Sequence, residues 1–357
     1  MKEAGEPAPT GGRWSIDRAA ADLHPAYFSL VMATGIVSMA AWVQGFAALA
    51  RGMVWLNAVF FAALWVLTAV RLARHRARLL ADFHDHNRGV GFFTMVPGAC
   101  VLGTQTLLIE QSASLAWGLW TTGAVLWAFL TYAVFTVLTI KPTKPALPDG
   151  LNGGWLVSIV ATQSVSLLTS QLAVHSGTGR EAMLFAALVL WLGGAMLYVW
   201  IISLIFYRYT FFPFKPSDLA PPYWINMGAM AISTLAGATL LLAGSETPVI
   251  SGMLPFVRGA TLLFWATATW WIPMLLILGV WRHLIRRFPL RYDPLYWGAV
   301  FPLGMYSVAT ARMNAALDLP FLREIPTFFF YVALAAWTAA LVGLGHRLLV
   351  GARASGA

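Results

Sequence analysis

Ten apolar stretches, each about 20 residues long, alternate along the chain with polar connections. A stretch of that length is typical of a helix that crosses a bilayer, because a helix satisfies its own backbone groups where no water can. The sequence therefore predicts ten membrane-spanning helices. They are expected near residues 25–44, 53–72, 92–110, 115–139, 154–174, 182–207, 222–243, 257–281, 295–315 and 325–349.

The connections after the odd-numbered spans are shorter than those after the even-numbered spans, so the helices are expected to pair as five hairpins. The fold class predicted is an all-α integral membrane protein with one transmembrane domain over residues 24–349. Residues 1–23 are polar and contain several Pro and Gly, which predicts a disordered lead-in. Residues 350–357 are expected to form a short tail.

Composition agrees with this assignment. The chain has 357 residues, of which 59% are hydrophobic and only 10% are charged, whereas soluble domains have about 25% charged residues. Its one cysteine, Cys100, excludes an intramolecular disulfide and gives no basis for a cysteine-ligated metal. We expect neither a metal nor another cofactor.

The net charge of +9 follows the predicted topology. Of the 23 Lys and Arg residues, 18 lie at the termini or in the connections after even-numbered spans, and five lie at the other ends. Basic residues favour the cytoplasmic side of a membrane. The pattern therefore predicts that both termini are cytoplasmic, with anionic lipid headgroups rather than nucleic acid as the partner of these charges.

Composition also differs between the two helices of each hairpin. Of the 17 tryptophans, 12 lie on even-numbered spans, while the odd-numbered spans hold most of the amide and small hydroxyl side chains. Polar groups in a span usually face the protein interior, so the odd helices are expected to form an inner ring around a lumen. Packing through small residues is the alternative explanation. The candidate lining residues are Thr34, Gly35, Ser38, Thr162, Ser166, Asn226 and Thr310.

No Asp, Glu, Lys or His lies deep in the odd spans, which favours anions or neutral solutes over metal cations as the transported species. Arg312 lies toward the end of the ninth span. It either makes a vestibule electropositive or joins Asp318, Arg323 and Glu324 in a network that braces a loop. His24, at the start of the first span, is either a pH-responsive group or an interface anchor.

Two odd spans contain aromatic residues, then a proline, then a glycine: GFFTMVPGA at 91–99 and VFPLG at 300–304. Proline removes a helix hydrogen bond and can kink the helix. Pro302 is therefore expected to direct the Phe301 ring into the lumen as a plug. Phe93 with Pro97 is the candidate for a second constriction. A kinked helix with packed rings is the alternative in both places.

Five motifs, one in each hairpin, resemble the tellurite-resistance/dicarboxylate transporter family. They are HPAYFSLVMATGIVS at 24–38, RGVGFFTMVPGA at 88–99, NGGWL at 152–156, APPYWINMG at 220–228 and YWGAVFPLGMYSVAT at 296–310. That family includes bacterial tellurite-resistance proteins, fungal malate permeases and sulfite pumps, and plant slow anion channels. The resemblance implies a homotrimer in the bacterial plasma membrane, one pore per subunit, and occlusion of the pore by Phe301. The fifth span lacks the proline often found in the family.

These observations predict an anion channel or uniporter rather than an enzyme. Two alternatives stay open. The first is a proton-coupled transporter of C4-dicarboxylates or sulfite, or a tellurite-related exporter. The second is a membrane-embedded enzyme, for which the sequence shows no catalytic cluster.

Overall fold

The computed structural model describes residues 16–245, 247–290 and 292–354, and this part of the chain is helical, without strands. The all-α prediction is confirmed. The ten long helices are α2 (Ser29–Val43), α3 (Ala47–Arg74), α5 (Met95–Leu108), α6 (Ala113–Ile140), α8 (Val157–Leu172), α9 (Arg180–Phe211), α10 (Ile225–Gly244), α12 (Leu254–Val280), α13 (Trp297–Leu317) and α14 (Glu324–Ala354). Four short helices complete the set: α1 (Ile16–Ala21), α4 (Arg76–Phe83), α7 (Leu147–Gly150) and α11 (Pro248–Ser251).

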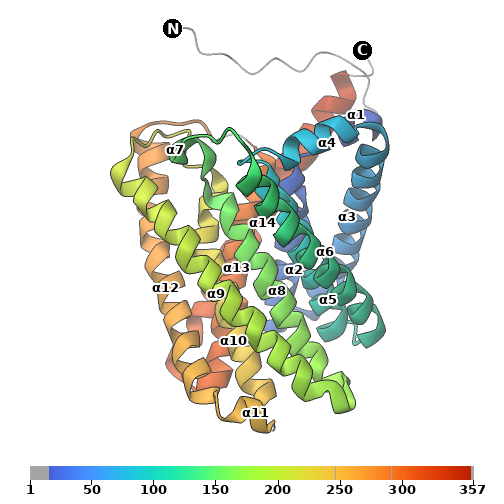
Figure 1. The fold of residues 1–357 in the computed structure, drawn as a ribbon, viewed down its shortest axis with the longest axis vertical. Coiled ribbons are helices and arrows are strands. Elements are labelled where there is room, and N and C mark those ends of the chain that lie inside the picture. Colours follow the sequence, from blue (N-terminus) through green and yellow to red (C-terminus); the bar gives the residue numbers. More distant parts are fainter. Residues whose placement is uncertain (1–15, 246, 291, 355–357) are drawn as a thin grey trace.

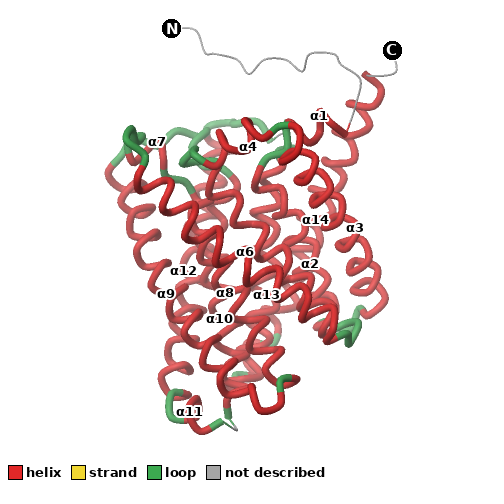
Figure 2. Tube along the Cα trace, turned by 45° about the vertical axis from the view of Figure 1, so that its right-hand side comes forward, coloured by secondary structure: helices red, strands yellow, loops and turns green. Residues whose placement is uncertain are grey.

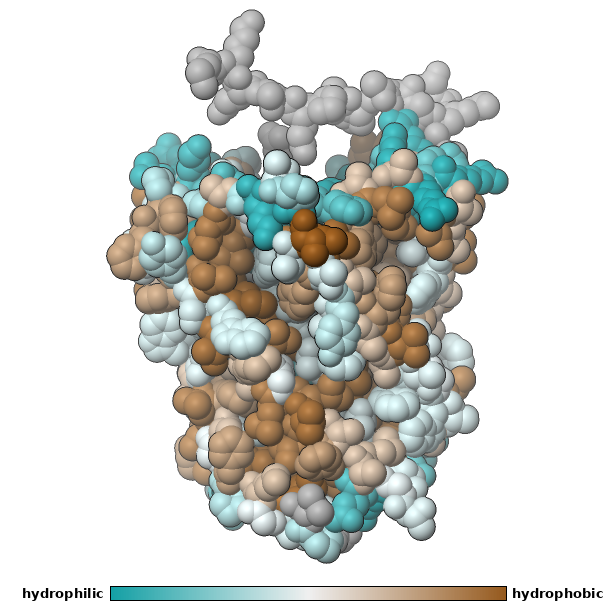
Figure 3. Space-filling model, in the orientation of Figure 1, coloured by the Kyte–Doolittle hydropathy of each residue, from teal (hydrophilic) through white to brown (hydrophobic). Residues whose placement is uncertain are grey.

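Nine of the long helices in the described residues are apolar and long enough to cross a membrane. The tenth, α13, has 21 residues and matches the predicted ninth span, but Arg312 and Asn314 lower its mean hydropathy. The molecule is apolar over its middle and more polar at its two ends (Figure 3). This distribution is typical of a membrane protein, in which lipid surrounds the middle and water contacts both ends.

The predicted lead-in over residues 1–23 is partly helical. Residues 1–15 lie outside the described residues, whereas α1 packs on α3. Asp17 of α1 contacts Arg74 at 3.4 Å and the His75 ring at 3.2 Å, and Ala20 is fully buried. Helix α14 continues to Ala354, so the expected tail begins as helix.

The long helices pair as consecutive hairpins, α2–α3, α5–α6, α8–α9, α10–α12 and α13–α14. The first helix of each hairpin is buried and the second is exposed. In α2, α5, α8 and α10, 78–100% of the most apolar segment is buried, against 17–33% in α3, α6, α9, α12 and α14. We call α2, α5, α8, α10 and α13 the inner helices and their partners the outer helices.

The inner helices contact one another in cyclic order: α2–α5, α5–α8, α8–α10, α10–α13 and α13–α2. Glycines allow close approach in this ring. A Cβ on Gly228 of α10 would lie 2.6 Å from Cγ of Pro302 on α13, and one on Gly304 would lie 2.9 Å from Ile36 of α2. Gly228 therefore lets α10 pack directly on the proline ring.

A 3-10 turn precedes every inner helix, at the end of the molecule where α1, α4 and α7 lie (Figures 1 and 2). We call these five segments the entry turns. Each contacts the next, and the last contacts the first. Gly91 and Gly153 permit backbone-to-backbone packing here, since a Cβ on Gly153 would lie 2.5 Å from the Pro222 carbonyl oxygen. The entry turns are η1 (Pro25–Phe28), η2 (Gly89–Thr94), η3 (Gly153–Leu156), η6 (Pro221–Trp224) and η8 (Pro294–Tyr296).

Candidate transport pathway

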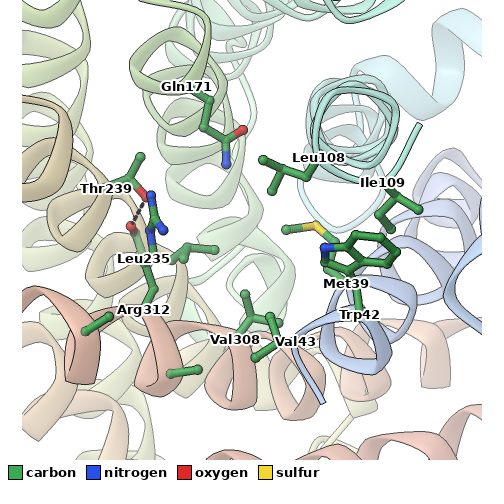
Figure 4. A pocket seen from close by; sticks show the side chains of 12 residues that line it. Met39, Trp42, Val43, Leu108, Ile109, Gln171, Leu235, Thr239, Val308 and Arg312 are labelled. Atoms are coloured by element: carbon green, nitrogen blue, oxygen red, sulfur yellow. Dashed lines mark hydrogen bonds between the residues drawn. The ribbon is translucent and has the colours of Figure 1, made fainter. Parts of the chain in front are cut away.

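A cavity of about 350 Å³ lies among the carboxyl-terminal ends of the inner helices, opposite to the entry turns. Figure 4 shows side chains from several inner helices directed toward it. Arg312 is the charged residue of the lining. The lining residues are Met39, Trp42 and Val43 of α2, Leu108 of α5 with Ile109, Gln171 of α8, Leu235 and Thr239 of α10, and Val308, Ala311, Arg312 and Ala315 of α13.

Contacts of α13 identify its side that faces the ring axis. Pro302 packs on α10 and Gly304 on α2. Tyr306 and Thr310 face the outer helix α12, where Trp265 donates to the Thr310 hydroxyl at 3.0 Å. The remaining side of α13, which none of these contacts occupies, carries Val308, and Val308 lines the cavity. We call this the axial face.

Phe301 lies on the same axial face, deeper than the cavity. It precedes Val308 by seven residues, a separation of about 20° around the helix and about 10 Å along it. Its side chain is fully buried. Helix α13 runs unbroken through Pro302, and the proline ring packs against Gly228 of α10.

Several of the predicted lining threonines instead face outer helices. In each case a tryptophan indole of an outer helix donates a hydrogen bond to the threonine hydroxyl oxygen. The pairs are Trp337–Thr34 at 3.0 Å, Trp127–Thr162 at 2.9 Å and Trp265–Thr310 at 3.0 Å. An inner-helix side chain that bonds to an outer helix points away from the ring axis, so these contacts argue against a lining role.

The remaining polar candidates have partners in the same direction. The Ser38 hydroxyl donates to Ala50 O at 2.8 Å, Ser166 donates to Ala187 O at 2.7 Å, and the Asn226 amide donates to Tyr209 OH at 3.2 Å. Gly35 packs toward α5 and α3, since a Cβ there would lie 2.4 Å from Val101 Cγ1 and 3.0 Å from the Asn57 and Gln105 side chains. Hydrogen bonds to outer helices thus account for Ser38, Ser166 and Asn226, as in the packing alternative.

Phe93 belongs to an entry turn, and its ring packs on Phe135 of the outer helix α6, with 5.6 Å between the ring centroids. Both Phe93 and Pro97 are buried. The contact with α6 favours packing over a second constriction at Phe93.

Two axial residues escaped the sequence analysis because only their position relative to the cavity distinguishes them. Gln171 lines the cavity. Ser164, seven residues earlier on α8, shares its face and donates to Val160 O of its own helix at 2.7 Å. A seven-residue step counted from Gln171 finds Ser164 once the cavity is known.

A charged cluster braces the end near the entry turns. Asp82 accepts hydrogen bonds from Arg71 Nη2 at 2.7 Å and from Arg88 Nε at 2.5 Å, which links α3, α4 and η2. Burial opposes ionisation of the Asp82 carboxyl, but the hydrogen bonds and charges of Arg88 and Arg71 outweigh it and lower its pKa.

His24 acts as the cap of the first entry turn. Its Nδ1 accepts a hydrogen bond from the Ala26 N–H at 3.1 Å. Burial, together with the nearby Arg88 charge, lowers the pKa of His24 to about 4, so the ring is neutral near pH 7. The described residues contain no cluster of three His, Cys, Asp or Glu side chains able to hold a metal ion.

Buried inner helices inside a sheath of lipid-exposed helices, with a cavity on the common axis, define a polytopic membrane transport protein. The chain belongs to the SLAC1 family, described as voltage-dependent anion channels, whose family model matches residues 22–344. The resemblance seen in the five motifs is thereby confirmed, and the protein is an anion-transporting membrane protein. Members of this family are channels and transporters rather than enzymes.

Individual relatives agree with the family assignment. An uncharacterised membrane protein of Mycobacterium tuberculosis is 43% identical over 153 residues, which cover 43% of this chain and 77% of that protein. An uncharacterised transporter of Methanocaldococcus jannaschii is 23% identical over 92% of this chain and 94% of its own length. A sulfite efflux pump of Trichophyton rubrum is 23% identical over 94% of this chain and 93% of its own length.

Proposed function

We propose that the chain conducts small anions passively along the axis of the inner helices and that Phe301 closes this path in the present conformation. The observation that supports the gate is the position of Phe301, fully buried on the axial face beneath a cavity that all five inner helices border. Pro302 and Gly228, packed together, fix the backbone next to the ring.

The chemistry of the axial face favours anions. Counting back seven residues from Met39 places the apolar Met32 on it, and the axial Ser164 uses its hydroxyl proton on Val160 O of its own helix. An ion there exchanges water for weak dipoles, with no carboxylate in the cavity lining to attract a cation. The positive charge of Arg312 at the cavity raises the local concentration of anions.

Similarity to the sulfite efflux pump extends over 94% of this chain, which makes sulfite the first anion to test. C4-dicarboxylates and tellurite are further candidates from the family resemblance. A proton-coupled carrier is the alternative mechanism. It would need a group that binds a proton during each cycle, or a substrate that brings the proton itself.

We further propose a homotrimer in the bacterial plasma membrane with both termini in the cytoplasm. The basic cluster of Arg74, Arg76 and Arg78 lies at the end of the entry turns, and basic residues favour the cytoplasmic side. The oligomer is measured by light scattering of the detergent-solubilised protein. Thiol labelling of cysteines introduced into the α7 and α11 loops of intact cells measures the orientation.

Anion flux into liposomes tests the gate. We expect wild-type protein to be nearly silent and Phe301→Ala to raise sulfite, nitrate and chloride flux at least about tenfold, without potassium flux. Phe93→Ala is the matched control, because it also truncates a buried ring but one that packs on an outer helix. If the folded Phe301→Ala protein carries no more anion flux than wild type, Phe301 is not the gate. Flux that requires a proton gradient would favour the carrier.

A further inference from the structure

Arg312 is directed into the cavity without an acidic partner among the described residues (Figure 4). Asp318 follows it by six residues, about 120° around the helix, and Arg323 instead contacts Glu324 at 3.8 Å. The bracing network expected as one alternative is therefore absent from the described contacts of Arg312. Arg312 is exposed at the cavity near the end of α13, so water can solvate the guanidinium there and an anion can reach it.

Gln171 adds a second polar group to the same cavity. The Thr104 hydroxyl lies 3.0 Å from both Gln171 Oε1 and Cys100 O, so it shares its one proton between them and holds the Gln171 amide oxygen on the side of α5. In Figure 4 the amide nitrogen of Gln171 points into the cavity from α8, across from Arg312 on α13. The Thr239 hydroxyl is already used, since it donates to Leu235 O at 2.8 Å.

The rest of the cavity wall is apolar, with Met39, Leu108 and Val308 among its residues. Apolar walls strengthen the field of a single charge in a concave site. The volume of about 350 Å³ exceeds that of one small ion by enough to keep several waters, each of which occupies about 30 Å³. The site can therefore hold an ion that has shed only part of its hydration.

We infer that this cavity binds a small oxyanion between the Arg312 guanidinium and the Gln171 amide. An oxyanion is favoured over a halide because the planar guanidinium can donate two parallel hydrogen bonds to two oxygens. The inference rests on the proposed function in placing the site on the transport path, but binding itself can be measured without transport.

Calorimetric titration of the full chain in detergent, with sodium sulfite, nitrate and chloride as probes, tests the site. We expect saturable binding of the oxyanions to wild-type protein and at least a tenfold weaker affinity in Arg312→Gln. Arg312→Lys keeps the positive charge but loses the planar guanidinium that can donate two parallel hydrogen bonds. It should therefore weaken sulfite and nitrate binding more than chloride binding. Gln171→Leu should weaken oxyanion binding severalfold.

Arg323→Gln is the matched control, because Arg323 lies at the same end of the molecule but outside the cavity lining, with Glu324 as its partner. It should bind oxyanions as wild type does. Equal affinity in Arg312→Gln and wild type, with unchanged melting temperatures, would overturn the inference. So would an Arg312→Lys variant with full oxyanion affinity, since a simple charge effect would then suffice.

Failure of the proposed function has a different signature. If anion binding depends on Arg312 but the Phe301→Ala variant carries no anion flux, the binding site is supported and the channel proposal is rejected. If Phe301→Ala carries anion flux but binding does not depend on Arg312, the channel proposal is supported and the binding site is rejected.

Discussion

Trp337 of α14 donates its indole N–H to the Thr34 hydroxyl of α2 across 3.0 Å, although 303 residues separate them in the sequence. Both side chains are buried. The bond joins the last outer helix to the first inner helix. It is one of several hydrogen bonds in which a tryptophan indole of an outer helix donates to a threonine hydroxyl of an inner helix.

Thr34→Val should lower stability without altering anion selectivity. The substitution leaves the buried Trp337 N–H without an acceptor, at a cost of about 1–3 kcal/mol. Trp337→Phe in the same background should recover part of this loss. Melting temperature in detergent measures the first effect, and liposome flux in the Phe301→Ala background measures the second. A change in the order of anion permeabilities would instead place Thr34 on the path.

Gly228→Ala should destabilise the contact between α10 and α13. Its Cβ would lie 2.6 Å from Pro302 Cγ, and overpacking of this kind costs about 1–3 kcal/mol. Gly193→Ala on α9 is the control, because no heavy atom lies within 4 Å of its added Cβ. The two variants are compared by melting temperature. Equal stability would show that the two helices separate easily.

Asp82→Asn should cost about 3 kcal/mol near neutral pH, because it leaves Arg71 and Arg88 without their carboxylate. Asp22→Asn is the control, since Asp22 and Arg78 are mostly exposed and such a pair contributes less than about 1 kcal/mol. The lowered pKa of Asp82 stabilises the fold above the ordinary carboxyl range. In wild type this contribution is lost as the pH falls below that range toward the lowered pKa, and in Asp82→Asn it is absent throughout. The measurement is the thermal unfolding of Asp82→Asn and Asp22→Asn at several pH values. Equal melting temperatures of the two variants at every pH would contradict the role given to Asp82.

His24→Asn should remove part of the acid sensitivity of the fold. The pKa of His24 is lowered from 6.5 to about 4, so the unfolded chain takes up a proton within that interval while the folded protein does not. Stability therefore falls as the pH drops from 6.5 to 4, by up to about 3 kcal/mol. Asn keeps the cap, as Asn152 does where its side chain accepts from Gly154 N–H at 2.7 Å in η3. Unchanged pH dependence of the melting temperature in the variant would contradict this prediction.

The sequence predicts the helices well because hydropathy and charge placement depend on composition over long stretches. It predicts the direction of individual side chains poorly. Thr162 and Gln171 lie on one helix nine residues apart, hence on opposite faces, and only Gln171 lines the cavity. Nothing in the sequence fixes which face is axial until one position is known. The gate role of Phe301 stays a prediction, whereas its place on the axial face follows from the described contacts.

The contact between the first entry turn, Pro25–Phe28, and the last, Pro294–Tyr296, has a consequence for biosynthesis. The ring of inner helices is closed by contacts between the first and the last of the five hairpins. Until the fifth hairpin is inserted, α2 and α10 each expose to lipid a flank that α13 covers in the finished protein. Contacts so distant in sequence form late, so quality control that recognises this uncovered flank can distinguish a chain that lacks α13 from one in which the ring is closed.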